Sequence, residues 1–265
     1  VVDVRCGVGL TRIQSCEGTH PMPSEGNIQE TSRLISLLES AGERDLVLFV
    51  ISGGGSTLLC QPATHTCFDE EDLLKDLFAQ GATISEVNTI RKHLSYARGG
   101  WLAKAAHPAQ LVSLIFSDVP GDDLATIASG PTVLDTSTIP DAGAILDRYD
   151  CVERIGFSKE HLFETPKEPH YFEKVTNQLV LTNKTALNAM QKKAEALGFS
   201  ARVCGTCLVG EARIVGSQIV EELHGEPAAS ALIYGGETTV NITGRGLGGR
   251  NQEMAMGALR SIKPG

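Results

Sequence analysis

Long apolar runs and positive charge are both scarce in this 265-residue sequence, and each shortage excludes a class of protein. No stretch approaches the roughly 18 consecutive apolar residues of a membrane-spanning helix, so no span is predicted. Lys and Arg number 23 against 32 Asp and Glu, and the net charge of −9 disfavours a nucleic-acid or anionic-membrane partner. The apolar fraction of 42% is ordinary for a soluble globular protein.

Common catalytic and nucleotide-binding motifs are also missing. The sequence has no Walker-type phosphate loop, no protein-kinase signature, no G-x-S-x-G elbow and no H-E-x-x-H zinc motif. No secretory leader pattern is present, so a cytoplasmic location is expected. An organellar address stays open because the first residue is Val1 rather than Met.

Cysteine offers one pattern among seven scattered residues. Cys204 and Cys207 have the C-x-x-C spacing of a redox or metal pair. A structural zinc site would need a second such pair or two spaced histidines, and neither occurs. We therefore favour ordinary cytosolic thiols over a redox or metal function.

Apolar runs typical of strands alternate with amphipathic segments typical of helices. Strands are expected at residues 46–51, 110–116, 178–181, 201–204, 231–234 and 239–243, the first of them buried on both faces. Helices are expected at residues 27–39, 69–79, 140–149, 184–197, 211–223 and 251–260, with Asp69 capping the second and residues 150–175 forming an irregular connection. This alternation predicts an α/β fold with a parallel sheet covered by helices on both faces.

Two loops follow predicted strands, at the sheet edge where ligands of α/β proteins bind. Ser52–Ser56 contains Gly53, Gly54 and Gly55, whose backbone N–H groups can approach an anion, although a plain tight turn is the alternative. The second loop carries Asp118 and Asp122, and paired carboxylates suit Mg²⁺, although Asp is also common in surface turns.

Further candidate segments are weaker by themselves. Residues 88–100 group Arg91, Lys92 and Arg98 near glycines, and a solvated helix face is the favoured interpretation. Gly244, Gly246 and Gly249 match the G-x-G-x-x-G dinucleotide fingerprint, which is weak without its acidic partner.

Taken in order, these segments resemble the glycerate 2-kinases of the MOFRL type. The resemblance is colinear over nearly the whole chain and rests on residues 20–23, 51–56, 81–84, 88–95, 98–100, 117–122, 127–132, 210–212, 235–240 and 248–253. It implies a Rossmann-like domain at 1–227 and the start of a smaller α/β MOFRL domain at 228–265, with the active site between them. The implied reaction is ATP- and Mg²⁺-dependent phosphorylation of D-glycerate at the 2-hydroxyl.

The resemblance also suggests roles. Ser52, Gly53, Gly54, Gly55 and Ser56 would bind a phosphate or the glycerate carboxylate, and Asp118 and Asp122 would hold Mg²⁺ or accept the substrate proton. The remaining candidates are Arg91, Lys92 and Arg250 for positive charge, Glu237 and Asn251 for orientation, and Gly248 and Gly249 for phosphate.

The sequence departs from this family in extent. An upstream segment with a glycine and a lysine, and the rest of the MOFRL domain, would lie outside residues 1–265. We therefore expect a truncated piece that is inactive and aggregation-prone alone, from a protein that can form a homodimer. An NAD(P)H-dependent hydroxypyruvate reductase and a non-catalytic sugar-acid binding protein are the competing functions.

Overall fold

The computed structural model describes residues 2–3, 14–20, 22–63, 66–241 and 246–263. The chain forms two compact units, Val1–Val180 and Leu181–Gly265. The boundary predicted at 227/228 therefore falls inside the second unit, because β7 pairs with β6 from before that boundary. Among the described residues, no helix is long and apolar enough to cross a membrane.

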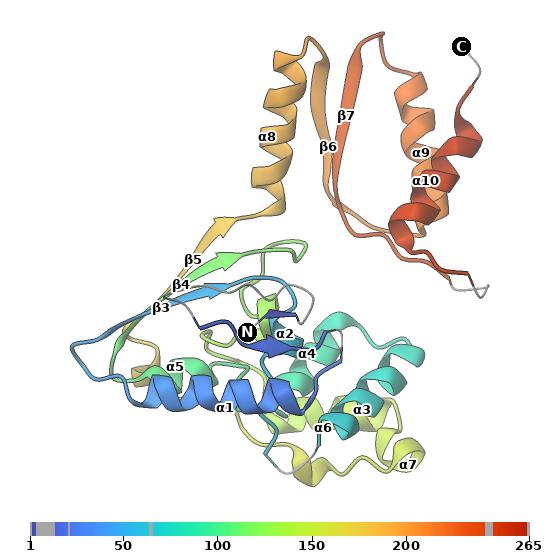
Figure 1. The fold of residues 1–265 in the computed structure, drawn as a ribbon. Helices are drawn as coiled ribbons and strands as arrows, with labels where there is room; N and C mark the ends of the chain where they lie inside the picture. Colours follow the sequence, from blue (N-terminus) through green and yellow to red (C-terminus); the bar gives the residue numbers. More distant parts are fainter. Residues whose placement is uncertain (1, 4–13, 21, 64–65, 242–245, 264–265) are drawn as a thin grey trace. The chain divides into compact units, whose positions relative to one another are not determined.

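The first unit is built on a three-stranded sheet in the order β3-β4-β5 (Figure 1). Its strands are β3 (Leu46–Ile51), β4 (Gln110–Phe116) and β5 (Val175–Leu181). β3 and β4 are parallel, with Leu46 opposite Gln110 and Ile51 opposite Ile115. Their carboxyl ends therefore lie side by side and place the loops that follow β3 and β4 next to each other.

Helices cover one face of this sheet. α1 (Glu25–Glu39) and α5 (Trp101–Ala106) pack against it through a cluster that includes Leu38, Leu102 and Leu111. The alternate residues of β3 are exposed, at 63% for Leu46, 60% for Leu48 and 64% for Val50. The expectation that this strand is buried on both faces is wrong for the described residues, because none of them in the first unit covers the second face of β3.

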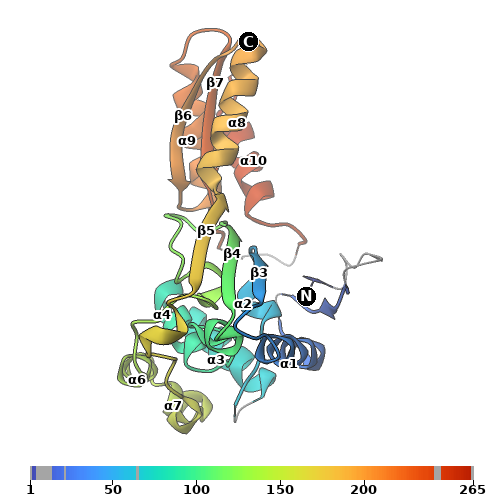
Figure 2. The same ribbon diagram turned by 90° about the vertical axis from the view of Figure 1, so that its left-hand side faces the viewer.

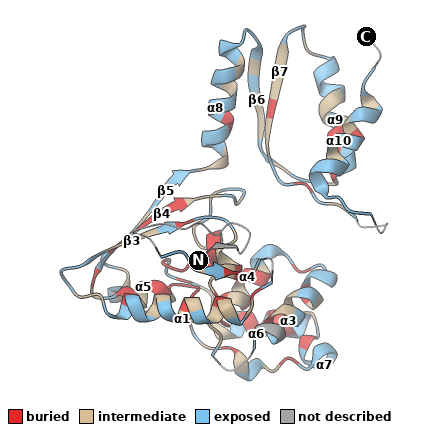
Figure 3. Ribbon diagram, in the orientation of Figure 1, coloured by how far each residue is buried: buried red, intermediate tan, exposed pale blue. Residues whose placement is uncertain are grey.

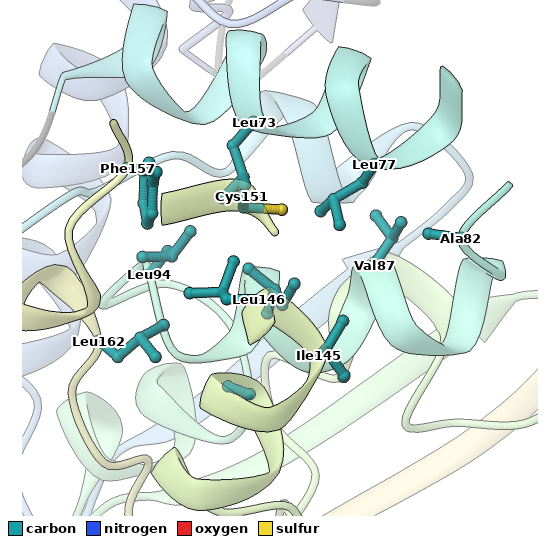
Figure 4. Packing of buried hydrophobic residues seen from close by; sticks show 12 residues of the cluster. Leu73, Leu77, Ala82, Val87, Leu94, Ile145, Leu146, Cys151, Phe157 and Leu162 are labelled. Atoms are coloured by element: carbon teal, nitrogen blue, oxygen red, sulfur yellow. The ribbon is translucent and has the colours of Figure 1, made fainter. Parts of the chain in front are cut away.

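Four helices of the first unit pack together through a buried apolar cluster (Figure 4). Leu73 and Leu77 point from α3 toward Leu146 of α6 and Val87 of α4, within a fully apolar cluster. The helices concerned are α3 (Cys67–Ala79), α4 (Ile84–Lys92), α6 (Ile139–Arg148) and α7 (Cys151–Ile155). The buried residues in and around α4 are visible in Figure 3. This core fixes α4, which carries three of the site's polar residues.

The helix starts follow local capping chemistry. Thr66 caps α3 by accepting from the Asp69 backbone N–H, so Asp69 is the third helical residue rather than the predicted cap. The region predicted as irregular, 150–175, contains α7 and two short 3₁₀ turns, Lys159–His161 and Pro169–Tyr171. The remaining small elements are β1 (Val2–Asp3), β2 (Glu17–Gly18), α2 (Gly55–Leu58) and the 3₁₀ turn Ile127–Ser129.

The second unit is a parallel pair of strands between helices (Figure 2). α8 (Asn183–Ala196) lies on one side of β6 (Ser200–Leu208) and β7 (Ser230–Gly236). α9 (Ala212–His224) and α10 (Arg250–Ser261) lie on the other. The strand predicted at 239–243 is reduced to a single bridge between Thr239 and Glu211, and residues 242–243 lie outside the described part.

Candidate functional site

The glycine-rich loop and Asp118 lie in direct contact at the carboxyl ends of β3 and β4. A Cβ placed on Gly53 would come within 2.0 Å of Asp118 Oδ2, so the carboxylate occupies the space that a side chain would take. One residue later, a Cβ on Gly54 would meet the His20 ring at 3.5 Å. A carboxylate and an imidazole therefore lie against successive glycines of the loop, at the strand ends where ligands of open α/β sheets bind.

Asp118 and Asp122 differ from the neighbouring Asp123 in the hydrogen bonds that their side chains make. Asp123 uses its side chain inside the loop, accepting hydrogen bonds from Ala125 N–H (3.2 Å) and Thr126 Oγ1 (2.6 Å). Asp118, which is exposed, and Asp122, which is half-buried, make no side-chain hydrogen bond or ion pair with any described residue. Asp122 holds a positive φ of 56°, a strained conformation outside glycine. Both carboxylates therefore remain available to a ligand.

A strained turn supports the glycine-rich loop from below. Ala128, Ser129 and Gly130 have consecutive positive φ angles of 52°, 58° and 60°. The missing side chain of Gly55 allows the close approach of Ala128, whose Cβ would lie 2.6 Å from a Cβ on that glycine. The turn places Ser129 Oγ 2.9 Å from Ser56 Oγ and 3.0 Å from Asn88 Oδ1.

The Arg91 side chain contacts the glycine-rich loop at a backbone carbonyl of that loop. Its Nη2 donates to the Ser56 carbonyl at 2.9 Å, and its Nε donates to the buried carboxylate of Glu70 at 3.3 Å. Burial and the nearby Arg98 guanidinium lower the pKa of Arg91 to about 10, against the opposing charge of Glu70, so it stays protonated at neutral pH. The structure thus places Arg91 as a support of the loop.

Lys92 faces away from the loop into a buried polar cluster. Its Nζ lies 2.6 Å from Asp135 Oδ1, and its residue surface is only 8% exposed. Asp135 also accepts from Ser137 (2.9 Å) and Thr165 (3.0 Å). Burial opposes ionisation of Asp135, but the hydrogen bonds and charge of Lys92 and the Ser137 donors outweigh it and lower its pKa. The predicted solvated face at 88–95 is therefore wrong: Asn88, Ile90 and Lys92 are buried.

The second unit brings together its own predicted residues. Glu237, just after β7, forms an ion pair with Arg250 at the start of α10, and both side chains are half-exposed. Gly248, Gly249 and Asn251 are exposed around the same helix start. Of the dinucleotide fingerprint, Gly244 lies outside the described residues, so the structure does not address that match.

One cavity of the first unit adjoins the glycine-rich loop. This cavity of about 230 Å³ is lined in part by Ser52, Gly53 and Gly55. A larger one of about 520 Å³, lined by residues that include Trp101 and Lys104, contains none of the predicted site residues. Within the described ranges, no group of three or more His, Cys, Asp or Glu can hold a metal ion, and the Cys204 and Cys207 thiols are free.

Three residues near the loop were not among the sequence-derived site candidates. His20, Asn88 and Ser129 each lie inside a stretch that carries the family resemblance, so their positions carried a signal. Their contacts join segments 34 to 73 residues apart, for example Ser56 with Ser129 at a separation of 73. No local spacing rule predicts such contacts.

Two family models and several named proteins match this chain. The family described as "Domain of unknown function (DUF4147)" matches residues 1–163, and the MOFRL family matches residues 230–264. A Pyrococcus horikoshii protein named "Glycerate 2-kinase" is 40% identical over 99% of this chain and 65% of its own length. A Thermotoga maritima protein named "D-glycerate 2-kinase" is 37% identical over 98% of this chain and 66% of its own length. The chain therefore spans just under two thirds of these relatives.

Other comparisons add one structure and one different name. The crystal structure of a glycerate kinase from Thermotoga maritima superposes with a TM-score of 0.84 at 36% identity, covering 97% of this chain and 63% of that one. An Agrobacterium vitis protein named "Putative hydroxypyruvate reductase" is 40% identical over 95% of this chain and 60% of its own length.

Proposed function

Because the chain belongs to the MOFRL-type glycerate 2-kinase family, we propose that it serves ATP-dependent phosphorylation of D-glycerate at the 2-hydroxyl, giving 2-phosphoglycerate and ADP. The observation that carries this proposal is the contact between Asp118 and Gly53. It places beside a glycine-rich loop a carboxylate that makes no side-chain hydrogen bond or ion pair with the described residues, in a chain whose relatives are named for glycerate kinases.

Asp118 and Asp122 are proposed to accept the proton of the substrate hydroxyl and to hold the Mg²⁺ that neutralises phosphate charge. A carboxylate beside the hydroxyl of glycerate can hold its proton as the oxygen attacks the γ-phosphorus of ATP. The backbone N–H groups of Gly54 and Gly55 offer donors to the glycerate carboxylate. Phosphoryl transfer depends mainly on such positioning and on charge neutralisation, which these groups supply.

Mg²⁺ fits a site with these two carboxylates when its other ligands come from water and ATP. It often binds through one or two carboxylates, with waters and substrate phosphates completing its shell. Two free carboxylates on one loop, without a third metal-binding side chain among the described residues, suit an ion that arrives with ATP. When bound, it would neutralise charge on the phosphates. Asp118 and Asp122 are the residues proposed to hold it.

Arg250 and Glu237 are proposed to serve the same reaction from the second unit. The Arg250 guanidinium can bind phosphate oxygens through paired N–H donors. Its ion pair with Glu237 holds that side chain at the start of α10, near Gly248, Gly249 and Asn251. Arg91 is proposed to position the Ser52–Ser56 loop, whereas Lys92 has no proposed contact with substrate because its charge is used by Asp135.

Binding measurements on the purified chain test this proposal. Isothermal titration should detect both D-glycerate and Mg²⁺–ATP, whereas NADH and hydroxypyruvate should not bind. In the full-length enzyme, Asp118→Asn should lower the rate of phosphoryl transfer, followed by ³¹P NMR, by about 100-fold or more. Asp147→Asn, on the exposed surface of α6, is the matched control. If the chain bound NADH and failed to bind ATP, the reductase would be favoured. If it bound glycerate and failed to bind ATP, a sugar-acid binding protein would be favoured.

A further inference from the structure

The polar chain from Ser56 through Ser129 to Asn88 has a fixed hydrogen-bond direction. Asn88 Oδ1 can only accept, so the hydroxyl proton of Ser129 points to it across 3.0 Å. A serine hydroxyl has one proton, and Ser129 has therefore none left for Ser56. Across the 2.9 Å contact between the two hydroxyls, Ser56 must be the donor.

This direction changes what Ser56 offers to a ligand. With its proton committed to Ser129, the oxygen of the half-buried Ser56 can offer a ligand only lone pairs. The neighbouring Asp118 carboxylate, against Gly53, also offers oxygen acceptors. ATP phosphates are also acceptors, so Ser56 gains nothing by facing them. A ligand group with donors, such as an alcohol hydroxyl, satisfies it.

The surrounding backbone holds this arrangement in place. Gly99 N–H donates to the Ser129 carbonyl at 2.8 Å, and Gly100 N–H donates to the Gly130 carbonyl at 2.8 Å. These bonds anchor a turn with three consecutive positive φ angles, two of them at residues other than glycine. Strain of this kind persists where the surrounding structure enforces it, and it clusters at functional sites.

We propose that Ser56 accepts a hydrogen bond from a hydroxyl of the bound hydroxy acid, with Ser129 and Asn88 as positioning residues that set its direction. The assignment rests on the proposed function and deepens it. The glycine-rich loop becomes the hydroxy-acid subsite rather than a phosphate cradle, and Ser56 becomes a determinant of specificity for hydroxyl groups.

A substrate-analogue cycle tests the assignment. Titrations compare D-glycerate with D-lactate, which lacks the 3-hydroxyl, and with 3-hydroxypropanoate, which lacks the 2-hydroxyl. The wild type should prefer D-glycerate to each analogue. Ser56→Ala should reduce one of these two preferences, on the order of tenfold, to near unity and leave the Mg²⁺–ATP Kd within about twofold. Ser56→Cys gives a second, similar-sized replacement with a weak acceptor.

The positioning residues have their own controls. Asn88→Asp keeps an acceptor and should retain the preference, whereas Asn88→Leu should reduce it. The assignment is overturned if Ser56→Ala weakens the binding of Mg²⁺–ATP or of Mn²⁺ instead. It is also overturned if the substitution weakens the binding of all three acids equally.

A direct view of the protons separates this inference from the proposed function. Neutron diffraction of the deuterated chain should place the Ser129 deuterium toward Asn88 and the Ser56 deuterium toward Ser129. The reverse direction overturns the inference even if D-glycerate binds. Failure of the wild type to bind D-glycerate, with the protons placed as expected, instead counts against the proposed function and removes the hydroxy-acid assignment with it.

Discussion

The Asp118 carboxylate lies against the backbone of Gly53, where a Cβ would come within 2.0 Å of Oδ2. That distance is shorter than any contact between a carbon and an oxygen that are not bonded, so even a methyl group must displace the carboxylate or the loop. The two strand ends are therefore fitted to each other through the smallest residue available. Each is aligned by the parallel register of β3 and β4.

Gly53→Ala should raise the D-glycerate Kd about tenfold or more, because it displaces Asp118 from the loop. The measurement is isothermal titration with D-glycerate. Gly143→Ala is the control, since Gly143 lies in α6 with open space around its Cβ position. That control should bind D-glycerate normally and gain about 0.5–1 kcal/mol of stability. Unchanged binding in Gly53→Ala would remove Asp118 from the proposed site.

Arg91→Lys should loosen the glycine-rich loop without removing the positive charge. Lysine is a point donor and cannot reach both the Ser56 carbonyl and the Glu70 carboxylate as the guanidinium does. Loss of one such charged hydrogen bond costs about 1.5–3 kcal/mol of stability, and the less ordered loop should bind D-glycerate with a higher Kd. Hydrogen exchange should rise at residues 54–59.

Arg148→Lys provides the comparison for that experiment. Arg148 pairs with Glu86 at the surface, where a charge-conserving change should alter neither binding nor exchange in the loop. If Arg91→Lys weakened binding while leaving loop exchange unchanged, Arg91 would contact the ligand directly instead of positioning the loop.

The sequence predicted the strands β3 and β4 and the longer helices, but it gave no bounds for α4 and missed the short helices α5 and α7 and the contacts between elements. The apolar runs gave the bounds of β3 and β4 as the structure has them, because a continuous apolar stretch ends where polar loop residues begin. Arg91 and Lys92 were assigned one role, yet successive helical residues point about 100° apart. One therefore reaches the loop and the other reaches Asp135, a distinction that depends on tertiary packing.

Lys92→Met should destabilise the fold rather than change the ligand affinity directly. It leaves the 3% exposed Asp135 with its nearest cation removed, and Lys167 Nζ at 3.7 Å replaces that charge incompletely. Breaking a buried pair in this way costs about 3 kcal/mol or more, which urea denaturation measures. Lys159→Met, which breaks the exposed pair with Asp147, should cost less than about 1 kcal/mol. A large rise in the D-glycerate Kd with full stability would instead return Lys92 to the binding site.

Stability should also depend on pH through His93, which is fully buried in the same polar cluster. Burial lowers its pKa from the ordinary 6.5, against the opposing influence of the Phe163 carbonyl, Asp135 and Glu164, while Lys167 adds to the lowering. Between the native pKa and 6.5, the unfolded chain binds a proton that the native chain does not. The contribution of His93 is therefore complete above pH 6.5 and is lost as the pH falls through that window.

Urea denaturation from pH 5 to pH 8 checks this dependence. The unfolding free energy should fall below about pH 6.5 with a slope of up to about 1.4 kcal/mol per pH unit from His93. His93→Gln should flatten that part of the curve, whatever its effect on overall stability. His170→Gln, at an exposed position, should leave the slope as it is. If the slope were unchanged in His93→Gln, His93 would not be the titrating group. The predicted slope arises because the buried His93 binds its proton less readily in the native state than in the unfolded state.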